Sequence, residues 1–307
     1  MEVSHVLTMK KILIVTNSRD NTATYIVEKY KGYAEFIRFN VDDFSDYIVE
    51  ICNWGWKLEC EAWKVYDDQI NSIYYRKPQL PNIESYDKTY HLMIARDIIS
   101  VVNGMVDSFN GKVISKPCIL RKTENKVYQM MNAMRNNLKM PMSYIGNSID
   151  GCKKIEFAKI IKPITTAKLK TNLGVELYGT NIYKETNEDI SLTPLYVQRY
   201  IKKKFEVRLT YVANKCFPVK IISKDEVDWR NDYSKHKYDI IDVPEVIDVK
   251  CKKILKDMAL VFAAFDFIVD ENGDWIFLEI NPNGQWLWLE QSLNIPISRQ
   301  IVGELLS

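Results

Sequence analysis

Hydrophobic positions near the start of the chain alternate between strand-like and helix-like spacing. KKILIVT at 10–16 is a short apolar run, TATYIVEKYKGY at 22–33 has apolar residues at helical spacing, and EFIRFN at 35–40 is again strand-like. This order of strand, helix and strand predicts a small α/β domain with a parallel sheet.

A further strand-like run, SIYYRKP at 72–78, ends at a proline. Arg76 and Lys77 therefore fall at a strand terminus, where α/β sheets usually place ligand contacts. Residues 86–108 then have the pattern of one long helix.

The pattern changes after residue 115. TENKVYQMMNAMRNNL at 123–138 predicts an amphipathic helix opened by half a capping box, with Thr123 as N-cap and Lys126 at the third helical position. MSYIG, a short helix from 148 and EFAKIIKPI at 156–164 predict a second α/β unit.

The last third begins with strands and ends with helices. Its three strand-like runs are TPLYVQRYI at 193–201, KFEVRLTYVA at 204–213 and CFPVKIISKD at 216–225. Residues 243–265 predict one long helix with Pro244 near its first turn, and a hairpin then precedes a helix near 296–306. The predicted fold class is α/β (α+β), with domains at 1–115, 116–195 and 196–307.

The hairpin contains an unusual set of polar residues. Asn272-Gly273 predicts a two-residue loop, because both central residues of a type I′ turn need positive φ. Counting back from this loop puts Asp266 opposite Glu279, and Asn281 shares the face of Glu279 because side chains two apart point the same way. The opposite, core face is predicted to hold Phe267, Val269, Ile276, Leu278 and Ile280.

Two opposed carboxylates on a half-buried sheet repel each other, and a divalent cation would remove that cost. Two carboxylates and an amide oxygen suit Mg²⁺ or Mn²⁺, especially when phosphate oxygens complete the shell. The alternative is that one carboxylate points to solvent or caps the next loop.

Composition narrows the class of protein. The 307 residues are 47% hydrophobic and 27% charged, with a net charge of +2, so nothing points to nucleic acid or an acidic membrane as partner. The six cysteines have no CxxC spacing, and neither a signal peptide nor an apolar run of membrane-spanning length is present. We expect a cytoplasmic protein.

The two common phosphate-binding loop motifs, GxxxxGK[ST] and GxGxxG, are absent from the chain. Other cationic side chains would therefore have to bind the phosphates of a nucleotide. Lys162, at the end of an apolar strand, and Lys126, at the start of a helix, are candidates. For each of them, a solvated surface charge is the alternative.

The stretch YVQRYIKKKFEVRL offers further contacts. One strand ends at 198–201, and Glu206 and Arg208 share a face of the next. Glu206 would accept from ribose hydroxyls, and the Arg208 fork would meet phosphate or carboxylate oxygens; a cross-strand ion pair on a solvent face is the alternative. DWR at 228–230 adds the guanidinium of Arg230.

Five features follow one another along the chain: a lysine before a helix, IIKPI, VQRYI, EVR and D…EIN. In this order they resemble the motifs of the ATP-grasp ligases. More specifically, KILIVTNSRDNTA, IYYRKP, VQRYIKKKFEVRLTYV, DWR and IFLEINPNGQWLWLE resemble the microviridin-type graspetide ligases, which macrocyclise ribosomal peptides. The match runs from about residue 10 to the C-terminus. EIN alone marks only ATP-grasp, whereas DWR with EINPNGQWLW is specific for this branch.

The resemblance implies an ATP-grasp fold behind an N-terminal pre-ATP-grasp domain, ATP and Mg²⁺ or Mn²⁺ as cofactors, and a precursor peptide with leader and core as partner. Homodimers are common in the family. The implied roles are metal ligation by Asp266, Glu279 and Asn281; phosphate contact by Lys126 and Lys162; an adenine hinge of Gln198, Arg199, Tyr200 and Ile201; ribose contact by Glu206; γ-phosphate and acyl-phosphate contact by Arg208 and Arg230; and a cleft wall that includes Arg76 and Lys77.

The segment after Lys162 departs from the family pattern. TTAKLKTNLGVELYG lacks the glycine pair that many ATP-grasp enzymes fold over the phosphates. Lys159 is an alternative to Lys162, and because the two face opposite ways on a strand, only one can point into the cleft. We favour Lys162.

The implied reaction activates an Asp or Glu side chain of the peptide as an acyl phosphate, which a Ser/Thr hydroxyl or a Lys amine captures as an ω-ester or ω-amide. No histidine is an obvious general base. The alternatives are an amino-acid or glutamate ligase acting on a protein tail or small metabolite, and a module that binds nucleotide or peptide without turnover. The two carboxylates, Asn281 and both arginines favour an enzyme.

Overall fold

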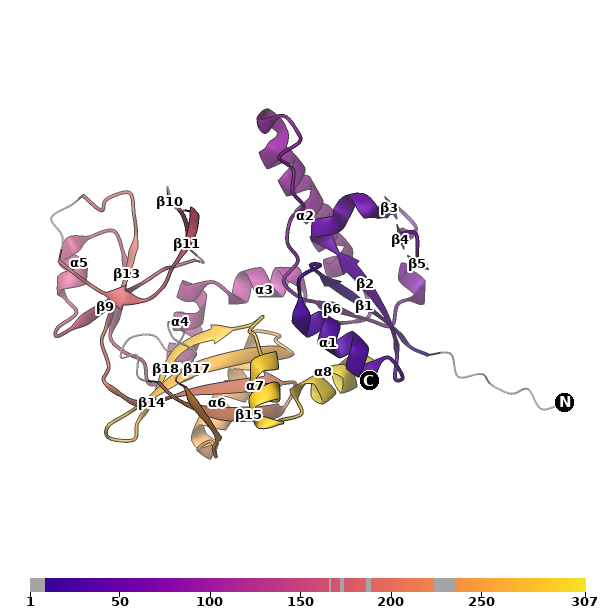
Figure 1. The fold of residues 1–307 in the computed structure, drawn as a ribbon. Coiled ribbons are helices and arrows are strands. Elements are labelled where there is room, and N and C mark those ends of the chain that lie inside the picture. The colour runs from indigo at the N-terminus through magenta and orange to yellow at the C-terminus, as the bar shows by residue number, and fades with distance from the viewer. Residues whose placement is uncertain (1–8, 166, 172–173, 186–188, 224–235) are drawn as a thin grey trace.

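The structure of the protein is a computed structural model that describes residues 9–165, 167–171, 174–185, 189–223 and 236–307, with the backbone alone at 167–171 and 174–178. Its described strands form five sheets, arranged in three lobes (Figure 1). In the described residues, no helix is long and apolar enough to cross a membrane.

The N-terminal lobe contains a parallel sheet in the order β2-β1-β6-β7, which confirms the predicted α/β unit. Its central strand is buried along ILIV, so its side chains pack on both faces of the sheet. The Asp20 carboxylate caps α1 by accepting from the N–H groups of Thr22 and Ala23. The bounds are β1 Lys11–Thr16, α1 Asn21–Tyr30, β2 Glu35–Asn40, β6 Ser72–Tyr75 and β7 Lys112–Ile114.

A small antiparallel sheet, β3-β4-β5, is inserted before β6, and α2 projects from the lobe (Figure 1). The helix predicted at 86–108 begins at His91, after a 3₁₀ turn whose N-cap is Asp87. The bounds are η1 Val41–Asp46, β3 Ile48–Cys52, β4 Gly55–Glu59, β5 Lys64–Tyr66, η2 Asp67–Gln69, η3 Lys88–Tyr90 and α2 His91–Ser108.

Two helices, α3 (Pro117–Thr123) and α4 (Lys126–Arg135), cross from the N-terminal lobe to the rest of the molecule. The prediction of Thr123 as N-cap is wrong: it ends α3, and its hydroxyl donates to the Ile119 carbonyl. Asn125 caps α4 instead, accepting from the Tyr128 N–H. Since Asn caps as well as Thr, the local sequence did not decide between them.

The central lobe is the antiparallel sheet β12-β9-β13-β8, beside the hairpin β10-β11. Because β13 pairs with both β8 and β9, the domain boundary expected between 195 and 196 cuts this strand after its first residue, and the central lobe extends to Arg199. The bounds are β8 Ser143–Gly146, α5 Ile149–Lys153, β9 Lys159–Lys162, β10 Ala167–Thr171, β11 Gly174–Tyr178, β12 Asn181–Ile182 and β13 Leu195–Arg199.

The C-terminal lobe is the antiparallel sheet β16-β15-β14-β17-β18. The helix predicted at 243–265 is only half right: α6 ends at Asp257, and Phe262–Asp270 is a strand. Ala259 adopts φ 54°, which turns the chain, and the Leu260 N–H closes the helix end on the Leu255 carbonyl. A buried central strand is an apolar run without alternation, so periodicity could not separate it from the helix.

The other bounds in this lobe are β14 Lys203–Val212, β15 Lys215–Ile222, β16 Lys237–Ile240, α6 Glu245–Asp257, β17 Phe262–Asp270 and β18 Trp275–Asn281, followed by α7 Leu287–Leu293 and α8 Ile297–Leu306. The last helices bury Ile297 and Ile301 in one core with Ile12 and Ile26 of the N-terminal lobe and Val219 of β15. The N- and C-terminal lobes therefore share a hydrophobic core.

Candidate functional site

The hairpin between β17 and β18 places Asp266 opposite Glu279, as predicted, but by a different route. Its loop has three residues instead of two: the Gly273 N–H donates to the Asp270 carbonyl, and Gly273 itself adopts φ 87°. A turn followed by a left-handed glycine is the usual three-residue hairpin. The first pair of the ladder is consequently Val269 with Trp275, one residue away from the predicted register.

A β-bulge in β18 restores the register. Phe267 pairs with Phe277, and the next pair is Asp266 with Glu279, so Leu278 is the extra residue. The predicted core face is therefore partly wrong: Phe277 packs in the core beside Phe267, whereas Ile276 lies on the opposite face and Leu278 is half-buried. Phe267, Val269 and Ile280 do pack in that core, as predicted.

Gln129 of α4 holds β18 at this point. Its side chain is almost fully buried, accepts from the Ile280 N–H at 3.0 Å and donates to the Ile280 carbonyl at 2.7 Å. Ile280 stands between Glu279 and Asn281, so this pair of hydrogen bonds fixes the strand that presents both. Sequence reasoning missed Gln129, because nothing distinguishes one glutamine on an amphipathic helix.

Cations accompany both carboxylates. Arg208 of β14 lies directly opposite Asp266, with 3.4 Å between Nη1 and Oδ1, and both side chains are nearly buried. Lys126 Nζ, at the start of α4, lies 2.5 Å from Glu279 Oε2. The structure thus brings together three predicted site residues and two predicted cations from four separate elements.

The donor set on this face fits a hard cation. Asp266, Glu279 and Asn281 offer two carboxylates and an amide oxygen, which Mg²⁺ accepts when phosphate oxygens or water complete its shell. Among the described residues, no group of three or more His, Cys, Asp and Glu side chains is placed to hold a metal. A metal here would therefore depend on the amide and on ligands from a nucleotide.

Glu206 shares this face of β14 with Arg208, as predicted, but it is not on a solvent face. Lys203 Nζ lies 2.8 Å from Glu206 Oε1, and both side chains are more than nine-tenths buried. The expected alternative, an exposed cross-strand pair, is excluded by this burial. Lys203 is a partner that the sequence reading missed.

The two candidate lysines of β9 lie on opposite faces of the central lobe's sheet. Lys162 pairs with Tyr196 and shares its face with Gln198. Lys159 is on the other face, 3.7 Å from Glu185. Since Tyr196, Gln198 and Lys126 line one narrow gap together with Phe277, the side of the sheet that carries Lys162 faces the C-terminal lobe.

In the predicted adenine hinge at 198–201, two of the backbone N–H groups already donate hydrogen bonds within the protein. The Arg199 N–H donates to the Met142 carbonyl and the Tyr200 N–H to the Ala158 carbonyl, each at 2.8 Å. An adenine at this place would have to use carbonyl oxygens or the Ile201 N–H.

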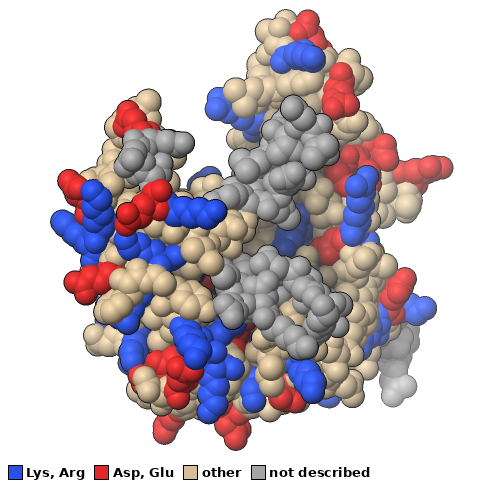
Figure 2. Space-filling view, turned by 60° about the vertical axis from the view of Figure 1, so that its left-hand side comes forward, with Lys and Arg blue, Asp and Glu red and all other residues tan. Residues whose placement is uncertain are grey.

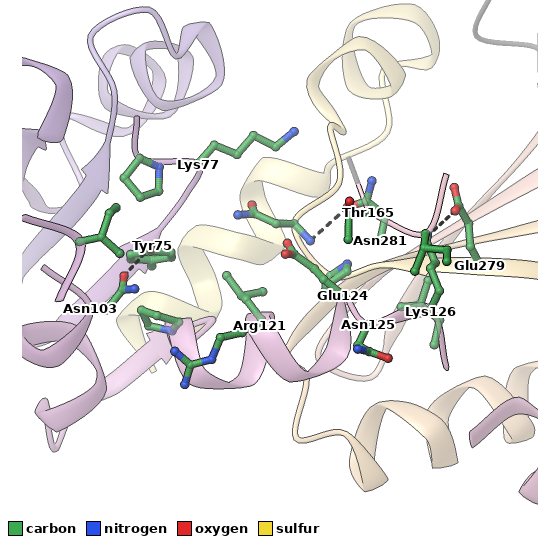
Figure 3. Close-up of a pocket in the computed structure, with 18 residues that line it drawn as sticks. Tyr75, Lys77, Asn103, Arg121, Glu124, Asn125, Lys126, Thr165, Glu279 and Asn281 are labelled. Atoms are coloured by element: carbon green, nitrogen blue, oxygen red, sulfur yellow. Dashed lines mark hydrogen bonds and ion pairs between the residues drawn. The ribbon is translucent and has the colours of Figure 1, made fainter. Parts of the chain in front are cut away.

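A cavity of about 690 Å³ lies in the recess between the lobes. The N-terminal lobe contributes Tyr75, Lys77 and Asn103 to its lining, the helices contribute Arg121, Glu124 and Lys126, and the end of β18 contributes Glu279, Asn281 and Asn283 (Figure 3). Figure 2 shows the surface deeply notched between two lobes.

Lys77 lines this cavity, whereas Arg76 does not. Arg76 is fully buried: its Nε lies 2.9 Å from Asp20 Oδ2, and its Nη2 donates to Thr22 Oγ1 at 3.1 Å and to Gln285 Oε1. The expectation that Arg76 forms part of the cleft wall is corrected accordingly. It ties the start of α1 to the loop after β18.

That loop also packs against Arg208. A Cβ on Gly284 would lie 2.8 Å from Arg208 Nη2 and 3.1 Å from the Ala264 Cβ, so a glycine leaves the space that the guanidinium uses. Arg230, the other predicted catalytic arginine, lies outside the described residues.

The N-terminal lobe matches a known domain family: residues 11–119 match the model described as the MvdD pre-ATP grasp domain. No curated protein shows significant sequence similarity to the chain.

Solved structures match over almost the whole length. The Chryseobacterium gregarium RiPP-associated ATP-grasp ligase, in complex with ADP and a leader and core peptide, is similar with TM-score 0.89 and 24% identity over 97% of each chain. Macrocyclase MdnC from Microcystis aeruginosa MRC, bound with precursor peptide MdnA, has TM-score 0.86 and 23% identity over 96% of this chain and 99% of that one.

A D-alanine–D-alanine ligase from Bacillus anthracis is also similar, with TM-score 0.61 and 14% identity over 97% of this chain and 96% of that one. Together these likenesses establish an ATP-grasp fold preceded by a pre-ATP-grasp domain, as the sequence predicted.

Proposed function

We propose that this chain is an ATP-dependent ligase that activates Asp or Glu side chains of a ribosomal precursor peptide as acyl phosphates and closes ω-ester or ω-amide rings with Ser, Thr or Lys. The main support is the sheet face that carries Asp266, Glu279 and Asn281 beside Arg208 and Lys126. The similar ligase from Chryseobacterium gregarium, solved in complex with ADP and a leader and core peptide, supports the choice of substrate.

In this proposal ATP lies in the gap between the central and C-terminal lobes. Lys126 and Lys162 contact its phosphates, Glu206 accepts from the ribose hydroxyls, and residues 198–201 border the adenine. Asp266, Glu279 and Asn281 would hold Mg²⁺, which when bound supplies charge neutralisation of the phosphates.

The residues of the chain then position the peptide carboxyl group and stabilise the charge that develops during phosphoryl transfer. The 690 Å³ cavity beside Glu279 and Asn281 receives the peptide carboxyl group next to the γ-phosphate. Arg208, held in place by Asp266 and by the Gly284 loop, donates to the oxygens on which charge develops as the phosphoryl group is transferred. Arg230 has the same proposed role on the resemblance alone.

We place the reaction in the cytoplasm, where ATP is abundant and reduced cysteines are normal. All six cysteines are unbridged. The homodimer that the resemblance implies stays a prediction.

The second candidate is an amino-acid ligase, since D-alanine–D-alanine ligase shares the fold. The higher similarity to a ligase solved with a leader and core peptide and to a macrocyclase solved with its precursor peptide favours the peptide substrate.

One experiment separates these functions. The full-length protein is incubated with ATP, Mg²⁺ and either a candidate precursor peptide or free amino acids, and ADP release and product mass are measured. Loss of one water from the peptide for each ring formed is expected. ADP release with amino acids alone would favour the second candidate, and none with any substrate would favour a binding module.

A further inference from the structure

The proposed reaction leaves one proton without an acceptor. When a hydroxyl or amine displaces phosphate from the acyl carbon, its proton must pass to a base. Neither His91 nor His236 lines the cavity, so a described histidine cannot take it directly. The identity of this base is inferred on the premise of the proposed function.

Lys77 lines the cavity two residues after the end of β6. Figure 3 shows its side chain reaching from the N-terminal lobe toward the side that carries Asn281. Its backbone adopts φ 46°, and its carbonyl accepts from Asn17 Nδ2 at 2.8 Å. The Asn17 side chain, just after β1, therefore helps to hold the backbone from which the Lys77 side chain projects.

The ammonium group of Lys77 is poorly compensated. Among the residues that the structure describes, no carboxylate lies within ion-pair distance of its Nζ, and the side chain is half-buried. The other described lysine on this cavity, Lys126, is paired with Glu279. A cleft cation that lacks both a counterion and full hydration loses its proton more easily than a surface lysine.

The surrounding charges agree with this picture. Burial, together with the positive charge of Arg76, lowers the pKa of Lys77 to about 8. Asp20, before α1, opposes them by raising this pKa; Arg208 of β14 lowers it further by a smaller amount, and Glu124, at the end of α3, has a still smaller raising effect. An appreciable fraction of the side chain is thus a neutral amine near neutral pH, as a general base must be.

We propose that Lys77 is the general base for ring closure. The nucleophile's oxygen or nitrogen attacks the acyl carbon, the new C–O or C–N bond forms, and its proton moves to the neutral Lys77 Nζ. The C–O bond to phosphate breaks, and inorganic phosphate leaves with the electron pair. The resulting ammonium returns its proton to solvent through the open cavity.

The test separates ring closure from activation. Full-length protein, ATP, Mg²⁺ and a cyclisable precursor peptide are assayed with and without hydroxylamine. Hydroxylamine traps acyl phosphate as a hydroxamate and needs no protein base. The ratio of ring to hydroxamate is then measured from about pH 6 to about pH 10, a range that spans the lowered and the ordinary lysine pKa.

For the wild type we expect this ratio to rise with pH and to level off near or above 8, since bound phosphates can only raise the pKa of Lys77. In Lys77→Met the ratio should fall roughly 100-fold, the lower limit of general-base effects, and lose its rise with pH. Lys77→Arg should behave like Lys77→Met, because arginine keeps the charge but does not give up its proton. Lys153→Met, at an exposed position of α5, is the matched control and should follow the wild type.

A second variant reports on the same base. Glu124 raises the pKa of Lys77, so Glu124→Gln should move the midpoint of the pH profile to lower pH.

Other outcomes overturn the proposal. Normal ring closure in Lys77→Arg would make Lys77 a cation that binds a carboxylate, and an unchanged profile in Lys77→Met would remove it from the step. If the wild type forms neither hydroxamate nor rings, the proposed function fails and this inference fails with it.

Discussion

At the scale of single residues, the site is a set of opposite charges removed from water together. Asp266 and Arg208 are both more than nine-tenths buried, and Glu279 is paired with Lys126. Breaking one partner of such a pair leaves an uncompensated charge, which is costly, so each residue constrains the others. Substitutions that keep shape and remove charge are therefore the cleanest probes.

Glu279→Gln is expected to lower ligation at least about 100-fold, because the amide keeps the hydrogen bond to Lys126 but no longer supplies an anion to the metal. Single-turnover ADP release at several Mg²⁺ concentrations measures this, and higher Mg²⁺ should restore part of the activity. Glu271→Gln, an exposed carboxylate on the same hairpin, is the control. Wild-type turnover in Glu279→Gln would contradict the assignment of Glu279 as a metal ligand.

Gly284→Ala is expected to displace the Arg208 guanidinium, since the new Cβ would lie 2.8 Å from Nη2. The end of a long side chain can move, so the melting temperature should change little, whereas kcat should fall by roughly tenfold or more through loss of an aligned donor. Gly303→Ala, where a Cβ would meet nothing, is the control. If kcat stays at the wild-type value, the loop does not position Arg208.

At the scale of elements, the decisive feature is the hairpin β17-β18. Its three-residue loop and its bulge at Leu278 each shift the register by one, and the two shifts cancel at Asp266 and Glu279. Because side chains alternate along a strand, either shift alone would have turned Glu279 toward the core. The sequence-based pairing was right from Asp266 to Ala264, on the site's side of the bulge, and wrong by one residue between the bulge and the turn.

The bulged strand depends on α4. Gln129→Leu removes both partners of the Ile280 backbone, and each unsatisfied buried group costs about 1–3 kcal/mol. We expect a lower melting temperature together with weaker Mg²⁺-dependent nucleotide binding, because Glu279 and Asn281 flank Ile280. Thermal melts with and without Mg-ATP would test this. A destabilised protein with unchanged nucleotide affinity would limit Gln129 to a role in stability.

At the scale of the whole molecule, the N-terminal lobe is packed closely against the C-terminal lobe. Helix α8 packs against β6, β7 and α1, and Trp286 is fully buried with its indole N–H donating to Tyr74 Oη at 3.2 Å. Arg76 bridges Asp20 and Gln285, so the loop after β18 is anchored in the N-terminal lobe. The N-terminal lobe is therefore joined to the C-terminal lobe by a shared core and by this anchor.

Gln285→Leu should weaken this anchoring, because Arg76 Nη2 loses a buried acceptor at a cost of about 1–3 kcal/mol. We expect a lower melting temperature and a higher KM for the peptide, since the loop also borders the cavity at Asn283. Gln291→Leu, exposed on α7, should leave both unchanged. If KM for the peptide in Gln285→Leu is the same as in Gln291→Leu, the contact between Arg76 and Gln285 does not influence the cavity.

The sequence by itself determined the strand and helix order of the N-terminal lobe, the strands β14 and β15 and the pairing of Asp266 with Glu279, since these follow from local periodicity and turn chemistry. The motif order also pointed to the ATP-grasp fold.

Only the tertiary structure decided where α6 ends and β17 begins, which of Lys159 and Lys162 faces the cleft, and that Arg76 is buried while Lys77 is not. It also brought in Gln129, Lys203 and Gln285. The physical reason is the same in each case: burial, ion pairing and close packing depend on neighbours many residues away, and a pattern along the chain records which side of an element a residue is on but not what lies opposite it.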